Sequence, residues 1–361
     1  MSEQFCVSVI VPFYNAQSYI KTCLDILLKQ DFIKPFEIIM VDDASTDDSQ
    51  NIVKKCKFPN LQLYSLQSNS GPAAARNLGL KKAKGKYIFF LDVDDTIAAN
   101  TLTTLYNFGN ETSCDLIISD KKIIENSQNQ RANVFAYPAD QEFGSSDFAE
   151  AMRRRFHDPL YIAGLFDLTG RLIKRSIISD NNIFFEEKLR YLEDETFMWD
   201  ILGFVRSAKY VRKQLYSYNV HPNVDTALSD GLSRGFQFSN FKLIKSHIQN
   251  SLKRRGFSIQ ELEKLSDQAF IFFIISLLVS YSRSMILGKT KSENSVKCRR
   301  KIIDDILAEA DVSKAIRNYL RSKDESPWIP RAIAWRSHKL LEFACTRRAK
   351  EILRIRRKGK V

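Results

Sequence analysis

The stretch from Lys86 to Thr96, KYIFFLDVDDT, decides how the rest of the sequence is interpreted. An apolar run from Tyr87 to Leu91 leads without alternation into three aspartates, Asp92, Asp94 and Asp95. Such a run is typical of a strand that is buried on both faces of a parallel sheet. Carboxylates this close repel one another, so they need a cation or shifted pKa values to coexist. Oxygen clusters of this kind suit Mg²⁺ or Mn²⁺, and a solvated acidic turn is the alternative.

The composition describes a chain with a sizeable core and an excess of positive charge. Of its 361 residues, 44% are hydrophobic, and the formal net charge is +13. This length suits one large domain or two, and the charge implies an anionic partner. Six scattered cysteines without a CxxC pair argue against zinc and a disulfide framework and indicate a reducing cytoplasm. The first residues, MSEQFC, lack the features of a signal peptide, so we do not expect secretion.

Apolar segments of strand length alternate with helical patterns through the first part of the chain. We expect strands at residues 7–12, 37–41, 61–66, 87–91 and 115–119, and another within 209–219. Strand–helix repeats at this spacing predict an α/β fold with a mostly parallel sheet flanked by helices. Residues 126–146 are polar with a weak pattern, and we expect a surface excursion there.

Polar groups follow three of the expected strands, at Phe13-Tyr14-Asn15, Asp42-Asp43 and Asp92-Val93-Asp94-Asp95. Ligands of open α/β sheets bind beyond the carboxyl ends of the strands, so we expect these groups on one rim. Asn15 is expected to cap the helix that follows it, and Ser45 or Thr46 the next one. Neither GxGxxG nor GxxxxGK follows the first strand, so a bound phosphate would need a metal or basic side chains.

Beyond Asp230, glycine and proline become rare and helical periodicity dominates. We therefore predict an α/β domain at residues 1–230, a helical region at 231–326 and a basic amphipathic tail at 327–361. The longest apolar stretch, Ala269 to Val279, is short of the roughly 18–20 residues of a spanning helix. We expect a buried core helix there, with a segment that dips into one leaflet as the alternative.

Four motifs occur in a characteristic order and spacing: VSVIVPFYN, IIMVDDASTDDS, NSGPAAARNLGL and YIFFLDVDD. They resemble the nucleotide-sugar-binding half of family 2 glycosyltransferases with the Rossmann-like GT-A fold. The later runs GRLIKRSIISDNNIFFEEKLRYLEDETF and YSYNVHPNVDTALS resemble the acceptor half. The resemblance covers about residues 5–230. It implies an inverting transfer from a UDP-sugar to a hydroxyl of a glycan or lipid-linked acceptor, in bacterial capsule, exopolysaccharide or lipopolysaccharide synthesis.

The resemblance also assigns roles to the residues after the opening strand. Asp94 corresponds to a direct ligand of the Mg²⁺ or Mn²⁺ that bridges the donor diphosphate, and Asp92 lies at the ribose or the metal. Asp95 has a supporting role, with capping of the next helix as the alternative. His221 corresponds to a histidine that completes the metal or diphosphate site, and a purely structural histidine is the alternative.

Four further residues correspond to donor-binding positions: Pro12, Tyr14, Asp42 and Arg76. Asp42 matches the acid that accepts from the uracil N3–H, Tyr14 lies near the uracil ring, and Arg76 lies near the nucleotide. The structural alternatives are a helix-entry cap, an aromatic residue packed on the rim, and a surface arginine.

Asp194 corresponds to the catalytic base of the family. An inverting transfer needs a carboxylate that takes the proton of the attacking hydroxyl. Glu193 is the rival for this role, and both acids could simply occupy the first turn of a helix. The sequence departs from the family pattern at Thr169-Gly170-Arg171 and at Asn219, which leaves the acceptor open. The QxxRW motif of processive synthases is absent, which favours single additions.

The tail holds much of the positive charge, with eleven basic residues and two acids from residue 327 onward. Apolar residues alternate with these charges, and Trp328 and Trp335 suit a membrane interface. We therefore expect an anionic membrane surface as the partner, no nucleic acid, and a peripheral location on the inner face of the cell membrane. One alternative is that Leu340, Leu341 and Phe343 pack on the catalytic domain while the charges face water. The others are a basic nucleic-acid- or lipid-binding protein and a nucleotidyltransferase on a related scaffold.

Overall fold

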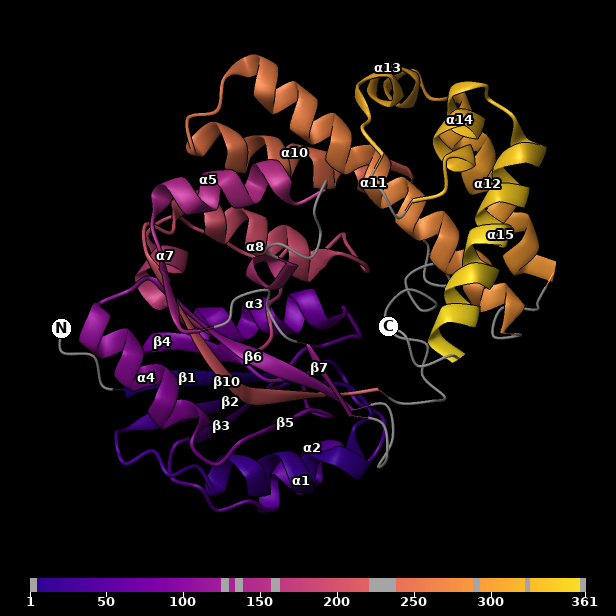
Figure 1. Ribbon diagram of the computed structural model, residues 1–361. Coiled ribbons are helices and arrows are strands. Elements are labelled where there is room, and N and C mark those ends of the chain that lie inside the picture. Colours follow the sequence, from indigo (N-terminus) through magenta and orange to yellow (C-terminus); the bar gives the residue numbers. More distant parts are fainter. Residues whose placement is uncertain are drawn as a thin grey trace. The chain divides into compact units, whose positions relative to one another are not determined.

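The computed structural model describes residues 5–124, 130–133, 139–156, 163–220, 238–287, 293–321 and 325–357 (Figure 1). The chain forms two compact units, and neither is one continuous segment. The first, here called the sheet unit, comprises Met1–Ala151, Leu160–Glu187 and Glu193–Pro222. The second, the helical unit, comprises Met152–Pro159, Lys188–Leu192 and Asn223–Val361. The boundary predicted at residue 230 lies outside the described residues.

The first four strands of the sheet unit are parallel, as the sequence predicts. They are β1 (Phe5–Phe13), β2 (Phe36–Asp42), β3 (Leu61–Ser65) and β4 (Gly85–Phe90). Their spatial order is β3-β2-β1-β4, so β3 lies at the edge. Because β1 and β2 have neighbours on both sides and helices on both faces, their residues are almost all buried. This burial explains why they read as continuous apolar runs.

The rest of the sheet is mixed. Its strands are β5 (Thr96–Ile97), β6 (Leu116–Ile124), β7 (Gln130–Asn133), β8 (Gln141–Phe143), β9 (Arg171–Lys174) and β10 (Ala208–Asn219). β9 lies antiparallel between β4 and β6, whereas β6 and β10 are parallel. The parallel character therefore belongs to the first four strands and to the β6–β10 pair.

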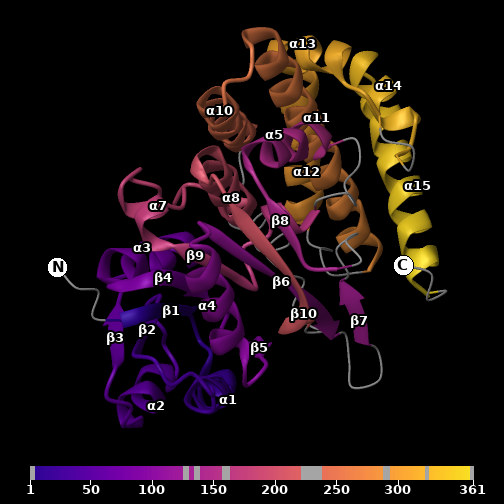
Figure 2. The same cartoon turned by 60° about the vertical axis from the view of Figure 1, so that its left-hand side comes forward.

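The surface excursion expected at residues 126–146 contains two short strands, in the part that the structure describes, that the sequence does not predict. There, β7 pairs with β6 and β8 pairs with β10, both antiparallel (Figure 2). β8 is three residues long, and two of them are exposed and polar. Short ladders of this kind are held by backbone hydrogen bonds at the sheet edge, so they leave no hydrophobic period in the sequence.

Helices cover both faces of the sheet. The sheet unit contains α1 (Gln17–Leu28), α2 (Ser49–Lys55), α3 (Pro72–Lys82), α4 (Thr101–Thr112), most of α5 (Ser145–Arg154), the 3₁₀ turn η1 (Ala163–Phe166), α7 (Arg175–Ser179) and α8 (Glu193–Phe204). Val7 and Val9 of β1 point into a core shared with α1, α2 and α4. Ile10 points to the opposite face and contacts Gly79 of α3, where an added Cβ would lie 2.5 Å from Ile10 Cγ2. These layers confirm the predicted α/β fold.

The predicted helix caps are wrong. Ala16, and not Asn15, is the N-cap of α1, and Asp48, rather than Ser45 or Thr46, is the N-cap of α2. Asn15 precedes Ala16 and has a φ of 47°. The free backbone N–H of Ala16 donates to Ser49 Oγ at 2.8 Å, and that of Gln17 donates to Asp47 Oδ2 at 3.1 Å. Asn15 Oδ1 accepts from Thr46 N at 2.8 Å instead, so the loops after β1 and β2 hold each other.

The helical unit is built on one long helix. Its helices are α10 (Phe238–Arg254), α11 (Ile259–Ile286), α12 (Glu293–Ala308), α13 (Ala310–Asn318), α14 (Trp328–Ala334) and α15 (His338–Arg357). A capping box between Ser258 and Glu261 begins α11, and α10, α13 and α15 pack against it. Among the described residues α11 alone is long and apolar enough to cross a membrane, yet 61% of its most apolar window is buried inside the protein. This burial matches the core helix that the sequence predicts.

Candidate active site

The aspartate turn after β4 is tied to strand β10 through Asp95. The Asp95 carboxylate accepts from Tyr216 Oη at 2.6 Å and from Asn219 N at 2.8 Å. Asn219 Nδ2 also donates to the carbonyl of Asp94 at 2.7 Å. Asp95 is 2% exposed and does not cap a helix, since α4 begins after Asn100. Asn219, which departs from the family pattern, therefore helps to hold the turn.

The turn concentrates negative charge. Burial and repulsion from Asp92 raise the pKa of Asp95 to about 8, although Tyr216 and Asn219 donate hydrogen bonds to it. Burial and the carboxylates of Asp95, Asp92 and Asp94 likewise raise the pKa of Tyr218 to about 12. A group of acids that shifts its neighbours in this way would be relieved by a cation.

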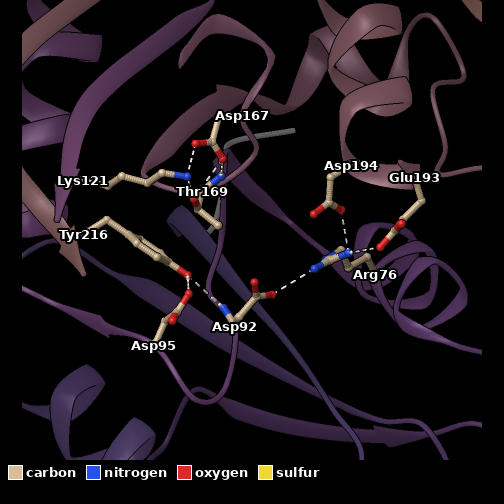
Figure 3. A network of polar contacts seen from close by, with 9 residues as sticks. All are labelled: Arg76, Asp92, Asp95, Lys121, Asp167, Thr169, Glu193, Asp194 and Tyr216. Atoms are coloured by element: carbon tan, nitrogen blue, oxygen red, sulfur yellow. Dashed lines mark hydrogen bonds and ion pairs between the residues drawn. The ribbon is translucent and has the colours of Figure 1, made fainter. Parts of the chain in front are cut away.

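Arg76 of α3 joins this turn to the start of α8 (Figure 3). Its Nη2 donates to Asp92 Oδ1 at 2.9 Å, and its Nη1 donates to Asp194 Oδ1 at 2.7 Å. Nη1 also lies 3.6 Å from Glu193 Oε1. The arginine is only 4% exposed, so burial alone would lower its pKa, but the three carboxylates raise it. The structural alternative, a surface arginine, is therefore wrong, because Arg76 is a buried ionic link.

The two acids at the start of α8 differ in exposure. The Asp194 side chain keeps 38% of its surface exposed, whereas that of Glu193 keeps 8%. Desolvation of its carboxylate and repulsion from Glu193 and Asp92 raise the pKa of Asp194 to about 8, although the positive charge of Arg76 opposes this shift. Burial also raises the pKa of Glu193. Of the two acids, Asp194 is the one that a substrate can reach.

A second residue of α3, Asn77, fixes the segment before α8. Asn77 Nδ2 donates to Phe185 O at 2.9 Å, and Asn77 Oδ1 accepts from Phe185 N at 2.8 Å. The Phe185 ring stacks on Phe197 of α8 at 3.9 Å between centroids, and the Arg76 guanidinium lies 5.5 Å from its centre. Adjacent residues of one helix thus position the acid pair, a role that the sequence does not reveal.

The predicted donor residues lie on the rim formed by β1 and β2. Pro12 and Asp42 are buried at the carboxyl ends of these strands, whereas Tyr14 is 40% exposed. The Asp42 carboxylate accepts from Ser45 N at 3.0 Å and from Gln50 Nε2 at 2.5 Å. These contacts hold the loop after β2, but Asp42 is not the helix-entry cap of the structural alternative, because α2 begins after Asp48. A contact with a nucleotide base stays a prediction for Asp42 and Tyr14.

Another part of the rim contains a polar cluster that sequence analysis missed. Lys121 of β6 forms an ion pair with Asp167, whose other oxygen accepts from Thr169 Oγ1 at 3.0 Å (Figure 3). Although burial favours its neutral form, Lys121 and Arg171 lower the pKa of Asp167. Lys121 Nζ also lies 5.8 Å from the centre of the Tyr218 ring, which places the cluster beside the aspartate turn.

The residues of the turn fit a divalent cation. Within the described part of the chain, no three His, Cys, Asp or Glu side chains gather closely enough to form a protein cage for a metal. Mg²⁺, however, is often held by one or two carboxylates together with substrate phosphates, and Asp92 and Asp94 offer two. The raised pKa of Asp95 marks the excess of negative charge that such an ion would offset. His221, the third predicted ligand, lies outside the described residues.

Comparisons with known proteins agree with these features. Residues 8–179 match Glycosyl transferase family 2. The glycosyltransferase GlyG of Streptococcus pneumoniae serotype 4 is 33% identical over 223 residues, which cover 60% of this chain and 71% of GlyG. The chain belongs to glycosyl transferase family 2. Membership of this family excludes the nucleotidyltransferase alternative.

Solved structures show that this family 2 chain has the GT-A fold. Residues 1–349 of Staphylococcus aureus TarS, in complex with UDP-GlcNAc, superpose with a TM-score of 0.65 at 21% identity, over 98% of this chain and 92% of that one. In sequence, the poly(ribitol-phosphate) β-N-acetylglucosaminyltransferase TarS of S. aureus Mu50 is 34% identical over 194 residues. The chain covers 53% of its own length in that match but only 31% of TarS. The predicted family and fold are both confirmed.

Proposed function

We propose that this glycosyltransferase moves a sugar from a UDP-sugar to a hydroxyl of a glycan or lipid-linked acceptor in the synthesis of a bacterial surface polysaccharide. The donor class is supported by TarS, whose fold the chain shares and whose structures contain UDP or UDP-GlcNAc. The names of several relatives support the acceptor class, because they describe poly(ribitol-phosphate) glycosyltransferases of S. aureus and Bacillus spizizenii.

One observation carries the proposal: a single guanidinium holds an acid of the aspartate turn and an acid of α8. Arg76 contacts Asp92 at 2.9 Å and Asp194 at 2.7 Å. Asp92, which we propose to face the donor, and Asp194, which we propose to face the acceptor, therefore contact the same guanidinium. A sugar transfer needs this closeness, because the anomeric carbon must lie between the leaving diphosphate and the attacking hydroxyl.

Asp194 acts as the base in this scheme. It takes the proton of the acceptor hydroxyl while that oxygen attacks the anomeric carbon from the face opposite the diphosphate, and the configuration is inverted. A positioned base typically contributes about 10²–10⁴ in rate, and it works best when its pKa lies near the operating pH. The pKa of about 8 for Asp194 meets that condition, and Arg76 restrains its carboxylate.

The remaining site residues bind and orient. Asp92 and Asp94 would hold Mg²⁺ or Mn²⁺, which supplies charge neutralisation for the leaving diphosphate. Asp95, Tyr216 and Asn219 keep the turn in place from within the fold. Contacts of the donor with Pro12, Tyr14, Asp42 and Arg76, and a contribution from His221, are part of the proposal.

The proposal can be tested by following the release of UDP from candidate UDP-sugars with Mn²⁺ or Mg²⁺, together with calorimetry of UDP binding. Asp194→Ala should lower the rate of transfer by about 10²-fold or more and leave UDP binding almost unchanged. Asp94→Ala should weaken the binding of UDP in the presence of metal. Asp25→Ala, at an exposed position of α1, is the control. Transfer at the wild-type rate by Asp194→Ala would exclude this residue as the base.

A further inference from the structure

Helix α15 exposes a regular stripe of cations with one aromatic residue in it. The stripe consists of Lys339, Phe343, Arg347, Lys350 and Arg354, all of them exposed. Their spacing of four, four, three and four residues places all five on the same side of a helix. The Phe343 ring is 62% exposed, so an apolar group lies in water among four positive charges.

The opposite side of α15 is packed inside the helical unit. Leu341, Ala344, Cys345 and Ala349 are buried, and the helix packs against α11. Leu341 packs inside the helical unit and not, as the structural alternative had it, on the catalytic domain, whereas Phe343 is exposed.

The acids of α15 are engaged elsewhere. Glu342 lies 3.3 Å from Arg299 of α12, which is itself 5% exposed and donates to Ser282 of α11. Glu351 pairs with Arg348 at 2.9 Å. No ion pair joins the four cations of the stripe to another residue of the described ranges 238–287, 293–321 and 325–357. The positive charge of the stripe is therefore directed to solvent.

Two tryptophans that precede α15 in the chain are also exposed. Trp335 is 64% exposed, and Trp328 at the start of α14 is 42% exposed. The Arg331 guanidinium lies 5.4 Å from the centre of the Trp328 ring, so a cation again accompanies an exposed aromatic residue. Trp335 lies in the turn that joins α14 to α15.

We propose that the stripe of α15, with Trp335 and Trp328, docks on a lipid bilayer that contains anionic headgroups. The cations would lie at the level of the lipid phosphates, and the three aromatic rings would enter the interface. Double-stranded nucleic acid would use the charges, but its bases are stacked inside the duplex and offer no apolar layer for rings that are 62% and 64% exposed. This inference goes beyond the proposed transfer reaction and does not depend on it. The predicted location at the inner face of the membrane would follow from it.

The test uses the full chain and two kinds of vesicle, phosphatidylcholine alone and phosphatidylcholine mixed with phosphatidylglycerol. We expect sedimentation with the mixed vesicles and a blue shift of tryptophan fluorescence. Each cation near an anionic surface is worth about 1 kcal/mol, or about fivefold in partitioning. Substitution of Lys339, Arg347, Lys350 and Arg354 together by Gln should lower binding by about 100-fold or more, and Phe343→Ser with Trp335→Ser should also weaken it at least tenfold.

A matched variant distinguishes the stripe from net charge. Lys253, Lys264, Arg300 and Lys301 are exposed cations on α10, α11 and α12, and their joint substitution by Gln removes the same charge. It should change binding by no more than a few-fold. Equal losses in the two quadruple variants would overturn the proposal, as would unchanged binding of the aromatic variant or equal retention by nucleic acid. Transfer to a soluble acceptor should stay at the wild-type rate in all three variants, which separates this proposal from the function proposed above.

Discussion

Arg76 donates to Asp194 at 2.7 Å from a helix that lies 118 residues earlier in the chain. The same guanidinium donates to Asp92 at 2.9 Å, so the position of the proposed base depends on the position of the aspartate turn. Displacement of either carboxylate would therefore change the environment of the other. This coupling can be examined with substitutions at Arg76.

Arg76→Lys retains a positive charge but loses the planar fork that reaches both acids. We expect kcat/KM to fall by about 10²-fold or more, because Asp194 loses its restraint. The pKa of Asp194 should rise further in Arg76→Gln, since Arg76 opposes its upward shift. The free energy of unfolding of Arg76→Gln should fall by only about 2 kcal/mol. The loss is limited because the side chains of Asp92 and Asp194 are 29% and 38% exposed, so water can solvate their charges. Steady-state kinetics and urea denaturation measure the two effects, and a fully active Arg76→Lys enzyme would contradict the positioning role.

The pH dependence of transfer follows from Asp194. The base acts as a carboxylate, and its pKa of about 8 means that most molecules are protonated at neutral pH. We therefore expect kcat/KM to rise as the pH increases and to level off above about pH 8. Transfer to a saturating acceptor should be followed across this range with the donor concentration held low. A rate that is constant from acidic to alkaline pH would exclude Asp194 as the titrating base.

Asn77 should contribute to stability through its two hydrogen bonds to the backbone of Phe185. Asn77→Leu removes both and leaves the N–H and C=O of Phe185 without their partner, at a cost of about 1–3 kcal/mol for each buried group. We expect the free energy of unfolding to fall by about 3 kcal/mol. The control is Asn51→Ala, which removes an exposed hydrogen bond to Asp48 and should change the free energy of unfolding by less than about 0.5 kcal/mol. Similar losses in the free energy of unfolding of the two variants would contradict the role of Asn77 in fixing the segment before α8.

Gly85, the first residue of β4, lies against the backbone of β1. An added Cβ would lie 2.5 Å from Ser8 N and 2.7 Å from Val7 C, which are both backbone atoms. Since backbone atoms of paired strands cannot move aside without loss of the ladder, Gly85→Ala should destabilise the fold by about 3 kcal/mol. The control is Gly144→Ala, whose Cβ would meet only Asp147 Oδ2 at 3.8 Å and should be nearly neutral. Thermal and urea unfolding of both variants measure the difference.

Much of the fold could be predicted from the sequence because the central strands are buried on both faces. The apolar runs at 7–12, 37–41 and 87–91 lie within β1, β2 and β4, except for one residue beyond the end of β4. β7 and β8 could not be predicted in this way, because they are only four and three residues long. A hydrophobic period cannot be recognised over so few residues.

The candidate site was only partly predictable for a different reason. Asp92, Asp94 and Asp194 follow from family motifs, but the contact of Arg76 with two of them depends on the folded chain. The ion pair between Lys121 and Asp167 likewise joins residues 46 positions apart, in segments without a characteristic motif. The local sequence pattern identifies which residue types follow the strands. Which acidic and basic side chains form ion pairs depends on how elements that are distant in the sequence pack together.

The chain enters the helical unit twice before it finally remains there. The short segments Met152–Pro159 and Lys188–Leu192 belong to that unit, and Phe156 of the first packs against Phe272 and Phe273. The second segment accepts a hydrogen bond from Asn240 at the carbonyl of Lys188. It ends one residue before Glu193. A protein shortened to end at Pro222 would therefore keep both segments and lose the helices against which they fold. We expect a fragment that ends at Pro222 to be less stable than the full chain, because both segments lose the helices against which they pack.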